Sequence, residues 1–543
     1  MKKKSSKKKS RTNFTAIDLY SGVGGWSLGF QIAGIKVTDS YEWWEPANNT
    51  HKSNLHSNTH QIDIRELDVT DLPSKVDFLV GSPPCTEFSY SNRGGSGNIK
   101  DGLKDVTKFL HTVKYLNPKF WAMENVPRLA NIFRNEILPG GQLEEFSDIL
   151  DPKMIHVYDF SKFGLPQRRK RCIAGNFDNE LLESYIVKFK ELSLGKVVTA
   201  LSKKRVQDPN FKFHLSTKNV TEQEKEEILN SEELRYNKEA KTNHPIYNNM
   251  AFPDPMEKTV RTITATCTRV SRESIVISDG NDYRRLTIRE RACLQGFPIS
   301  YQFMGKSYAA KLKMIGNAIP PVFTYYLANA MLGTKVDDLL KVDEVDYCFS
   351  LPEVQTERTK PDSAGKKYPR DRSFRFAIPH LRFKSGTRFE LNNQKGKGRW
   401  LIEFFFGDSK RIHSLELGTK NYNAVSKLIK KWAPDYQKEI QSILKSRIPK
   451  VDCTELQKVW SNTACGIHPF EILDSLGELG SSLIKLSKNL NHEVFSKIVT
   501  NIIELHFSKN GNSIAKAKLE KYAREIVVGI ILGSAFNKSN HRL

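Results

Sequence analysis

A strand, a glycine-rich turn and a helix follow one another near the start of the chain, and this unit constrains the fold more than any other feature. Residues 14–20, FTAIDLY, are a continuous run of apolar and β-favouring residues, SGVGG follows them, and the next stretch, 26–33, is amphipathic. A buried strand that leads through a tight turn into a helix is typical of the first unit of a parallel α/β sheet.

The same alternation continues along the chain. Helical-looking segments such as 103–116 separate further apolar runs, which lie at residues 36–43, 76–82, 119–125, 156–160 and 171–177. Alternating strands and helices predict an α/β fold with a doubly wound, mostly parallel, Rossmann-like sheet and helices on both faces. Ligands bind such sheets at the carboxyl ends of the strands, so the residues there are the candidates for function.

The glycine-rich turn predicts a nucleoside-binding site. Gly22, Gly24 and Gly25 follow the first strand, and Glu42 lies about twenty residues later, where a doubly wound fold places a carboxylate that binds a ribose. Trp43 beside it is suited to lie against an adenine ring. The spacing Gly-x-Gly-Gly is not the nicotinamide fingerprint, so an adenosyl cofactor without a pyrophosphate is favoured. A turn that only packs the helix closely on the sheet is the alternative.

Cys85 lies behind two prolines in VGSPPCTEFS, at the end of the run 76–82. A single cysteine is more often a small buried hydrophobe than a catalyst. At the carboxyl edge of a sheet, however, a following helix or a nearby cation lowers a thiol pKa and raises the thiolate fraction. Both interpretations, packing and nucleophile, stay open on these residues alone.

Two further elements reach the same predicted edge. The run 119–125 ends in Glu124 and Asn125, and a buried carboxyl there would have a raised pKa and act as a proton donor. Arg169 and Arg171 of PQRRKR alternate along an extended segment, so they are expected to share a face and bind a phosphate or carboxylate. A helix cap and a basic surface turn are the structural alternatives.

The composition predicts a polyanionic partner. The net charge is +23 and the pI is about 9.5, which favours DNA or RNA. The seven cysteines are widely spaced and contain no Cys-x-x-Cys pair or Cys/His cluster, so no metal site is expected and a reducing intracellular compartment is predicted. The longest apolar run, 526–536, is too short to span a bilayer, so a soluble protein without membrane contact is expected.

Changes in composition and in the periodicity of apolar residues divide the chain into six segments. Residues 1–13 are a basic tail that is expected to be disordered, and residues 14–177 hold the alternating units. A loop-rich module follows at 178–285, periodicity resumes at 286–335, and 336–375 is a charged linker. The extension 376–543 predicts strands at 381–391, with a turn at Ser385 and Gly386, and at 399–407, then helices. Within it, Val494, Ile498, Ile502 and Leu505 share one helical face and are expected in a core.

In combination and order, six motifs resemble those of the DNA (cytosine-5)-methyltransferase family of bacterial restriction-modification systems. They cover about residues 14–330 and read DLYSGVGG, GSPPCTEFS, MENV, QRRKR, RLTIRERACLQGFP and GNAIPP. The resemblance implies that Cys85 is the nucleophile, that Glu124 engages the cytosine ring nitrogen, that Arg169 and Arg171 are active-site arginines, and that Asn125 supports the Pro-Cys loop.

The resemblance also implies a pocket for S-adenosyl-L-methionine. Tyr20, Gly22, Gly24 and Gly25 would line it, Glu42 would bind the ribose, and Trp43 would face the adenine. Asp68 would bind the adenine amino group, with Asp63 as a nearby competitor, and Asn317 belongs to the last motif. Tyr20 stands where the family usually has Phe, which retains an aromatic wall.

The implied function is methylation of carbon 5 of a flipped cytosine in a specific duplex DNA sequence, through a covalent Cys85 adduct. The module 178–285 would be the target-recognition domain. We expect a monomer on DNA, located in the bacterial cytoplasm at the nucleoid, with a cognate restriction endonuclease as its genetic partner. A transfer-RNA cytosine methyltransferase and a non-catalytic DNA-binding regulator are the alternatives.

The extension beyond residue 340 lies outside the resemblance. A DNA-contacting extension, a scaffold for a partner and a second activity are the three options for it. A nuclease would require a metal-binding pattern, and Asp408, Glu416 and Lys420 offer only a loose one. An accessory fold is therefore favoured over a nuclease.

Overall fold

The chain folds into two compact units. The computed structural model describes residues 14–89, 97–242, 250–364, 370–383, 387–394, 396–407, 412–507 and 516–540. Unit 1 consists of residues 1–230 and 253–362, and unit 2 consists of residues 231–252 and 363–543. The basic tail 1–13, the turn at Ser385 and Gly386, and Asp408 lie outside the described residues.

Unit 1 is built on a seven-stranded sheet in the order β3-β2-β1-β4-β5-β8-β6. Strands β3, β2, β1, β4 and β5 are parallel, while β8 runs antiparallel to both β5 and β6. The prediction of a mostly parallel, doubly wound sheet is therefore confirmed. The strands are β1 (Thr15–Leu19), β2 (Lys36–Tyr41), β3 (Asn58–His60), β4 (Phe78–Gly81), β5 (Phe120–Asn125), β6 (Ile155–Asp159) and β8 (Lys170–Gly175).

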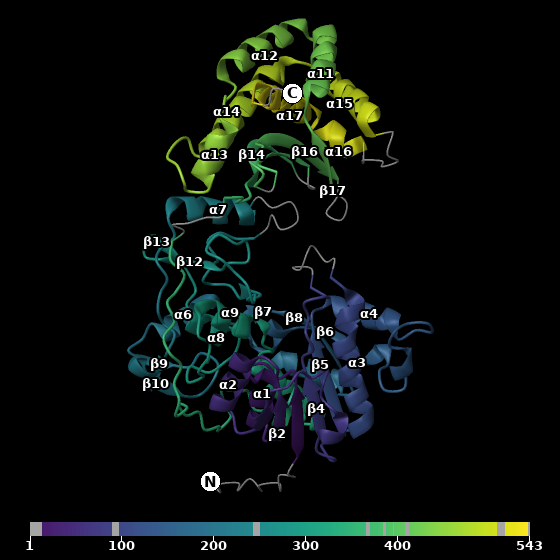
Figure 1. The fold of residues 1–543 in the computed structure, drawn as a ribbon, viewed down its shortest axis with the longest axis vertical. Coiled ribbons are helices and arrows are strands. Elements are labelled where there is room, and N and C mark those ends of the chain that lie inside the picture. The colour runs from purple at the N-terminus through teal and green to yellow at the C-terminus, as the bar shows by residue number, and fades with distance from the viewer. Residues whose placement is uncertain are drawn as a thin grey trace. The chain divides into compact units, whose positions relative to one another are not determined.

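Helices cover both faces of this sheet because its strands are apolar on both sides. Phe78 and Val80 of β4 belong to one core cluster, and Leu79 between them belongs to another. The first cluster includes residues of α1 and α10, and the second includes residues of α3 and α4 (Figure 1). The helices of unit 1 are α1 (Gly25–Ile32), α2 (Glu45–Asn54), α3 (Ile99–Leu116), α4 (Arg128–Glu136), α5 (Asn179–Ser184), α6 (Leu194–Leu201), α8 (Ile288–Leu294), α9 (Tyr308–Asn317) and α10 (Pro321–Met331).

The end of unit 1 packs against its beginning. A β-carbon at Gly25 would lie 2.0 Å from the carbonyl oxygen of Ile319, so only glycine allows the first helix to approach this closely. The Thr324 hydroxyl of α10 donates to the Gly25 carbonyl at 2.8 Å. The segment after residue 286 thus packs against the Gly-rich turn and its helix, about three hundred residues earlier in the chain.

Short strands connect the rest of unit 1. The segment predicted as loop-rich forms three pairs of short strands, two within itself and one with β7, which precedes it. The pairs are β9 (Arg205–Gln207) with β10 (His214–Ser216), β7 (Gln167–Arg168) with β11 (Val260–Arg261), and β12 (Val276–Asp279) with β13 (Asp282–Arg285). The β7–β11 pairing is parallel and joins the QRRKR motif to the stretch RTITATCTRVSRES. The predicted recognition module is therefore attached directly beside the two predicted arginines.

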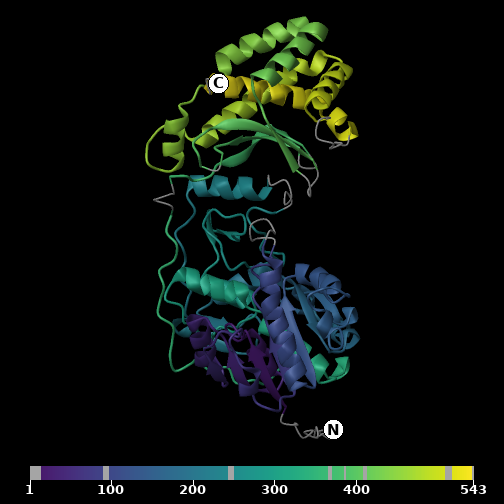
Figure 2. The same cartoon turned by 45° about the vertical axis from the view of Figure 1, so that its right-hand side comes forward.

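Unit 2 consists of a four-stranded antiparallel sheet and helices. The apolar residues of β14, β15 and β16 share a core cluster with α14 and α17, and these two helices lie along one face of this sheet (Figure 1 and Figure 2). Ile498 and Ile502 of α15 are buried there, as predicted. The elements are β14 (Arg375–Arg382), β15 (Arg388–Asn392), β16 (Leu401–Gly407), β17 (Ile412–Glu416), α11 (Thr419–Trp432), α12 (Pro434–Arg447), α13 (Cys453–Trp460), α14 (Pro469–Leu486), α15 (His492–Phe507), α16 (Lys516–Lys521) and α17 (Ala523–Asn540).

One helix of unit 2, α7 (Ser231–Thr242), comes from the middle of the segment 178–285. Arg235 pairs with Asp474 through both guanidinium nitrogens (2.7 and 3.1 Å), and Glu232 accepts from Arg372 at 2.7 Å. The Tyr236 ring stacks on Trp460. The segment predicted as one recognition module is therefore shared between the two units. Among the described residues, no helix is long and apolar enough to cross a membrane.

Candidate active site

The loop that carries Cys85 leaves the sheet at the carboxyl end of β4. The Trp26 indole of α1 donates to the Ser82 hydroxyl at 3.0 Å, which ties the start of the loop to the first helix. The backbone amide of Ser89 donates to the Cys85 carbonyl at 3.0 Å, so the cysteine occupies a turn. Cys85 is thus held at the edge of the sheet, where the sequence places it.

Glu124 and Asn125 end the adjacent strand β5, next to the Cys85 loop. The Asn125 side-chain amide donates to the Pro83 carbonyl at 2.9 Å, and its oxygen accepts from the Val126 amide at 2.9 Å. Glu124 is buried and pairs with Arg171 of β8, whose Nε lies 2.9 Å from the carboxylate. The structure therefore brings the thiol loop, a carboxylate and a guanidinium together at one edge.

Arg169 makes different contacts from Arg171. Its side chain is 1% exposed, and its two terminal nitrogens donate to the backbone carbonyls of Ile263, Gly316 and Ala318 at 3.0 to 3.2 Å. Burial holds the pKa of this guanidinium well below its ordinary value. Arg169 therefore joins the segment after β11 to the end of α9, whereas Arg171 pairs with Glu124, and the expectation that both arginines bind one anion stays a prediction.

The charges around Cys85 act in opposite directions. Burial raises the pKa of the Cys85 thiol above its ordinary value, Arg171 and Arg169 oppose this rise, and the Glu124 carboxylate adds to it. The nearby cations therefore do lower the pKa of the thiol, but desolvation is the larger effect, so the pKa is raised on balance in the chain without substrate. The thiol is mostly protonated at neutral pH and must lose its proton before it can act as a nucleophile.

This balance predicts slow alkylation of Cys85 at neutral pH. Because the thiolate is the reactive form, the rate of modification by iodoacetamide should rise with pH, with its midpoint above that of an unperturbed thiol, about 8.5. Quantitative mass spectrometry of the Cys85 peptide measures the profile, and the exposed Cys465 in the same digest is the internal standard. A midpoint below pH 8 would contradict the predicted effect of burial.

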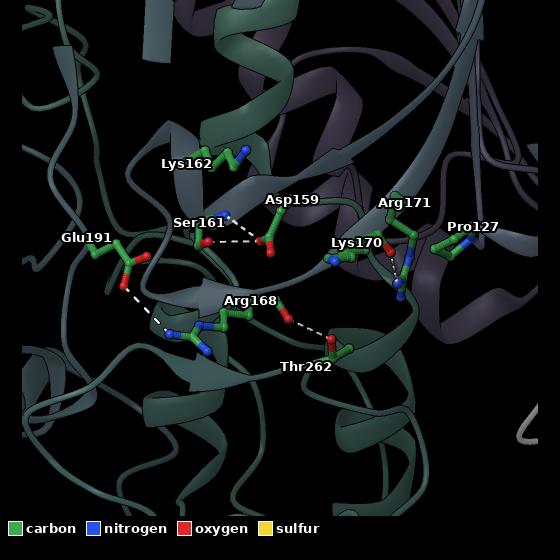
Figure 3. Close-up of a pocket in the computed structure, with 9 residues that line it drawn as sticks. All are labelled: Pro127, Asp159, Ser161, Lys162, Arg168, Lys170, Arg171, Glu191 and Thr262. Carbon is green, nitrogen blue, oxygen red and sulfur yellow. Dashed lines mark hydrogen bonds and ion pairs between the residues drawn. The ribbon is translucent and has the colours of Figure 1, made fainter. Parts of the chain in front are cut away.

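A basic cavity of about 590 Å³ has Arg171 in its wall (Figure 3). Lys162, Arg168, Lys170 and Arg171 outnumber the two acids in its wall, and Glu191 lies 3.9 Å from Arg168. Lys162 was not predicted from the sequence, because only the fold brings it next to the arginines. The lining residues are Pro127, Asp159, Ser161, Lys162, Arg168, Lys170, Arg171, Glu191 and Thr262.

The predicted cofactor residues surround the end of β1. Tyr20 and Gly22 both have a positive φ of 52°, and Gly24, with φ 89°, precedes α1. A side chain at Gly22 would meet no atom within 4 Å, so there is open space above this turn. The Tyr20 hydroxyl donates to the Asp105 carbonyl at 3.2 Å. A strained tyrosine beside a glycine turn is typical of a functional loop.

Glu42 and Trp43 lie next to this turn. The Glu42 carboxylate accepts from the backbone amides of Gly22 (2.9 Å) and Trp44 (2.8 Å), while burial raises its pKa. Each of its oxygens retains acceptor capacity for a further donor. The Trp43 side chain is 57% exposed, although indole rings are usually buried. The pair therefore offers a carboxylate and a free aromatic face, which suit a ribose and an adenine.

The remaining predicted residues are at the surface. Asp68 is exposed, and its carboxylate accepts from the amide and hydroxyl of Thr70 (2.9 and 2.8 Å), which holds its pKa below the usual range. Asp63 is exposed as well. Asn317 is exposed at the end of α9. The Ser21 hydroxyl is buried and has no protein partner in the described part of the chain, which leaves it available to a ligand.

Several known proteins are similar to this chain. A family model described as C-5 cytosine-specific DNA methylase matches residues 14–333. The Type II methyltransferase M1.HphI of Haemophilus parahaemolyticus is 29% identical over 349 residues, which cover 60% of this chain and 88% of that protein. M.HindV of Haemophilus influenzae is 28% identical over 325 residues, covering 58% and 96%. The solved structure of the S. pombe Dnmt2 methyltransferase aligns with a TM-score of 0.41 at 15% identity, covering 59% of this chain and 99% of that one.

Proposed function

The chain belongs to the family of C-5 cytosine-specific DNA methylases, and on this premise we propose that Cys85, Glu124 and Arg171 carry out the methylation of carbon 5. The convergence of these three side chains at one edge of the sheet is the observation that carries the proposal. The activity is that of a DNA cytosine-5 methyltransferase of the restriction-modification type.

Cys85 acts as the nucleophile. Carbon 5 of cytosine is a poor nucleophile, so the reaction begins when the thiolate forms a bond to carbon 6 and gives the ring enamine character. The thiol proton must leave first, because burial keeps it on the sulfur in the free chain, and the nearby Glu124 carboxylate is placed to accept it and so to become the carboxyl that acts on the ring. Binding of the base therefore has to supply the conditions under which the thiol ionises, and Arg171 and Arg169 are the cations nearby that favour the thiolate.

Glu124 acts on the ring nitrogen. Addition of the thiolate places negative charge on the ring, and a carboxyl that donates a proton or hydrogen bond to nitrogen 3 stabilises it. Arg171, at 2.9 Å, fixes the orientation of this carboxyl, and Asn125 holds the Pro-Pro-Cys loop through the Pro83 carbonyl. After methylation, the carbon 5 proton is lost and the bond between sulfur and carbon 6 breaks, which restores the thiolate.

S-adenosyl-L-methionine is the proposed methyl donor. Its sulfonium supplies an electrophilic methyl group, and its nucleoside fits the open turn at Gly22, the Glu42 carboxylate and the exposed Trp43 ring. Tyr20, Gly24 and Gly25 would form the wall of this pocket, Asn317 of the last motif would close it, and Asp68 would bind the adenine amino group.

The basic cavity supports a path for the substrate strand. A cytosine inside a stacked duplex is out of reach, so it must flip into the site, and the phosphates beside it then need cationic partners. Lys162, Arg168 and Lys170 line the wall next to Arg171 and are placed to bind such phosphates. We propose that one copy acts on each site, that residues 178–285 read the sequence, and that a cognate endonuclease is the genetic partner.

Label transfer tests this function. The purified chain should transfer a methyl group from labelled S-adenosyl-L-methionine to duplex DNA, and nucleoside mass spectrometry should identify 5-methylcytosine. Expression in a host that lacks DNA methylation should then give 5-methylcytosine in one sequence context across the genome. Transfer to transfer RNA alone, or to the exocyclic amino group of cytosine, would contradict the proposal.

A further inference from the structure

The positive charge of the chain is concentrated in unit 2. This unit contains 35 Lys and Arg against 19 Asp and Glu, whereas residues 14–230 and 253–362 of unit 1 contain 42 of each. The part that holds the proposed catalytic residues is therefore neutral overall. Because excess charge of one sign marks the surface that attracts a polyanion, the search for such a surface leads to unit 2.

Helix α11 has one basic side and one buried side. Lys420, Lys427 and Lys431 are exposed and are separated by seven and four residues, which places them on one face of the helix. Val425 and Ile429 are buried on the opposite face. The row of three lysines is about 16 Å long, which matches about five base pairs of duplex DNA. The charges are thus arranged in a line and not scattered around the helix.

Helix α12 extends this arrangement. It follows α11 after the single residue Ala433, and Lys438 and Lys445 are exposed on one side of it, again seven residues apart. Lys430 is also exposed on α11. We call these residues the basic face. Within the described part of unit 2, Lys438 is the only one of them with a carboxylate within 4 Å (Asp435, 3.7 Å). The members of the basic face are Lys420, Lys427, Lys430, Lys431, Lys438 and Lys445.

We propose that unit 2 is a DNA-binding module that holds the phosphate backbone of duplex DNA through the basic face, independently of sequence. Lysines spaced along a helix suit phosphates as point charges, and binding releases the counterions of the duplex. This function goes beyond methylation, because the basic face lies outside the residues that the family model matches.

The course of the chain connects this module to the proposed recognition segment. Helix α7 interrupts the proposed recognition segment and packs into unit 2 through the pairs Arg235–Asp474 and Glu232–Arg372. The chain then re-enters unit 1 at residue 253. A duplex held by unit 2 is therefore tethered to the segment that reads its bases, which raises the effective concentration of one for the other. The module is expected to increase affinity for all duplexes and to leave the sequence preference unchanged.

Neutralising the α11 part of the basic face tests the proposal. The full chain with Lys420→Gln, Lys427→Gln, Lys430→Gln and Lys431→Gln should bind a duplex without target sites with a shallower salt dependence. Each lost phosphate contact reduces the slope of log K against log salt by about 0.9, so a total change of about 3.6 is expected for the four lysines. The wild type should then lose about 150-fold more affinity than the variant between 50 and 200 mM salt.

The matched control removes the same number of charges elsewhere in unit 2. Lys458, Lys485, Lys488 and Lys497 are exposed on other helices, and their change to Gln should leave the slope nearly unchanged. Equal slopes for the α11 variant and the wild type, or equal losses in both variants, would overturn the proposal. So would a loss seen only with transfer RNA, which would assign the face to RNA. Binding is measured without methyl donor, so failure of methylation would leave this test intact.

Discussion

Replacement of Cys85 by serine is expected to abolish methyl transfer. A hydroxyl of nearly the same size keeps the loop geometry, but it is a far weaker nucleophile than a thiolate at neutral pH. Removal of a covalent nucleophile lowers the rate by several orders of magnitude, so we expect a loss on the order of 10,000-fold or more in single-turnover label transfer. Binding of duplex DNA should change little.

The exposed Cys465 of unit 2 provides the matched control. The substitution Cys465→Ser makes the same chemical change outside the site and should leave the rate at the wild-type value. Retention of activity in Cys85→Ser, with both proteins equally folded by thermal unfolding, would show that the methylation does not depend on this thiol.

The second large effect is expected for Glu124→Gln. The amide cannot transfer a proton to the cytosine ring, and it no longer pairs as an anion with Arg171. General acid catalysis contributes about 100-fold to 10,000-fold, and the rate should fall by that factor while duplex binding is retained. Because the Glu124 charge raises the pKa of Cys85, the same change should move the alkylation midpoint of Cys85 to lower pH.

The methylation rate should fall while the reactivity of the Cys85 thiol at a given pH should rise. A general loss of structure would not produce this combination. Glu191→Gln is the control, since Glu191 is a carboxylate in the wall of the neighbouring cavity and is not proposed to act on the base. Unchanged methylation in Glu124→Gln would remove the carboxyl from the mechanism, even if the thiol became more reactive.

Much of the sheet could be predicted from the sequence because its strands are buried on both faces. A strand of this kind is a continuous apolar run, and the run 76–82 became Phe78–Gly81. The direction of β8 could not be predicted in the same way. Its run, RCIAGNF, has the same apolar character as the parallel strands. The direction of β8 depends on how the chain passes through β6 and β7, and the residues of these strands do not indicate that direction.

The contacts of the candidate catalytic residues were harder to predict than their positions at the end of the strands. Glu124 and Arg171 were expected at one edge, but the acceptors of Arg169 lie at Ile263, Gly316 and Ala318, about 90 to 150 residues further along the chain. The rise in the pKa of Cys85 was missed for a similar reason, since desolvation depends on how closely the whole unit packs around the thiol.

Helix α7 is the described helix within the predicted recognition segment that belongs to unit 2. Residues 231–242 lie in a segment of loop-rich composition, and the residues that anchor α7, such as Asp474 and Trp460, follow more than two hundred positions later. Nothing within the helix itself indicates its partner. The same holds for the concentration of charge, which becomes meaningful only once the two units are known.

The covalent bond between Cys85 and carbon 6 of a cytosine is the central claim, and a trapped adduct tests it most directly. A duplex in which the target cytosine carries fluorine at carbon 5 cannot lose a proton there, so the adduct should persist after methylation in the presence of S-adenosyl-L-methionine. Mass spectrometry of the digested complex should find the modified nucleotide and one added methyl group on the peptide that contains Cys85. An adduct on another cysteine, or normal methylation of the unmodified duplex without any trapped adduct, would contradict the account.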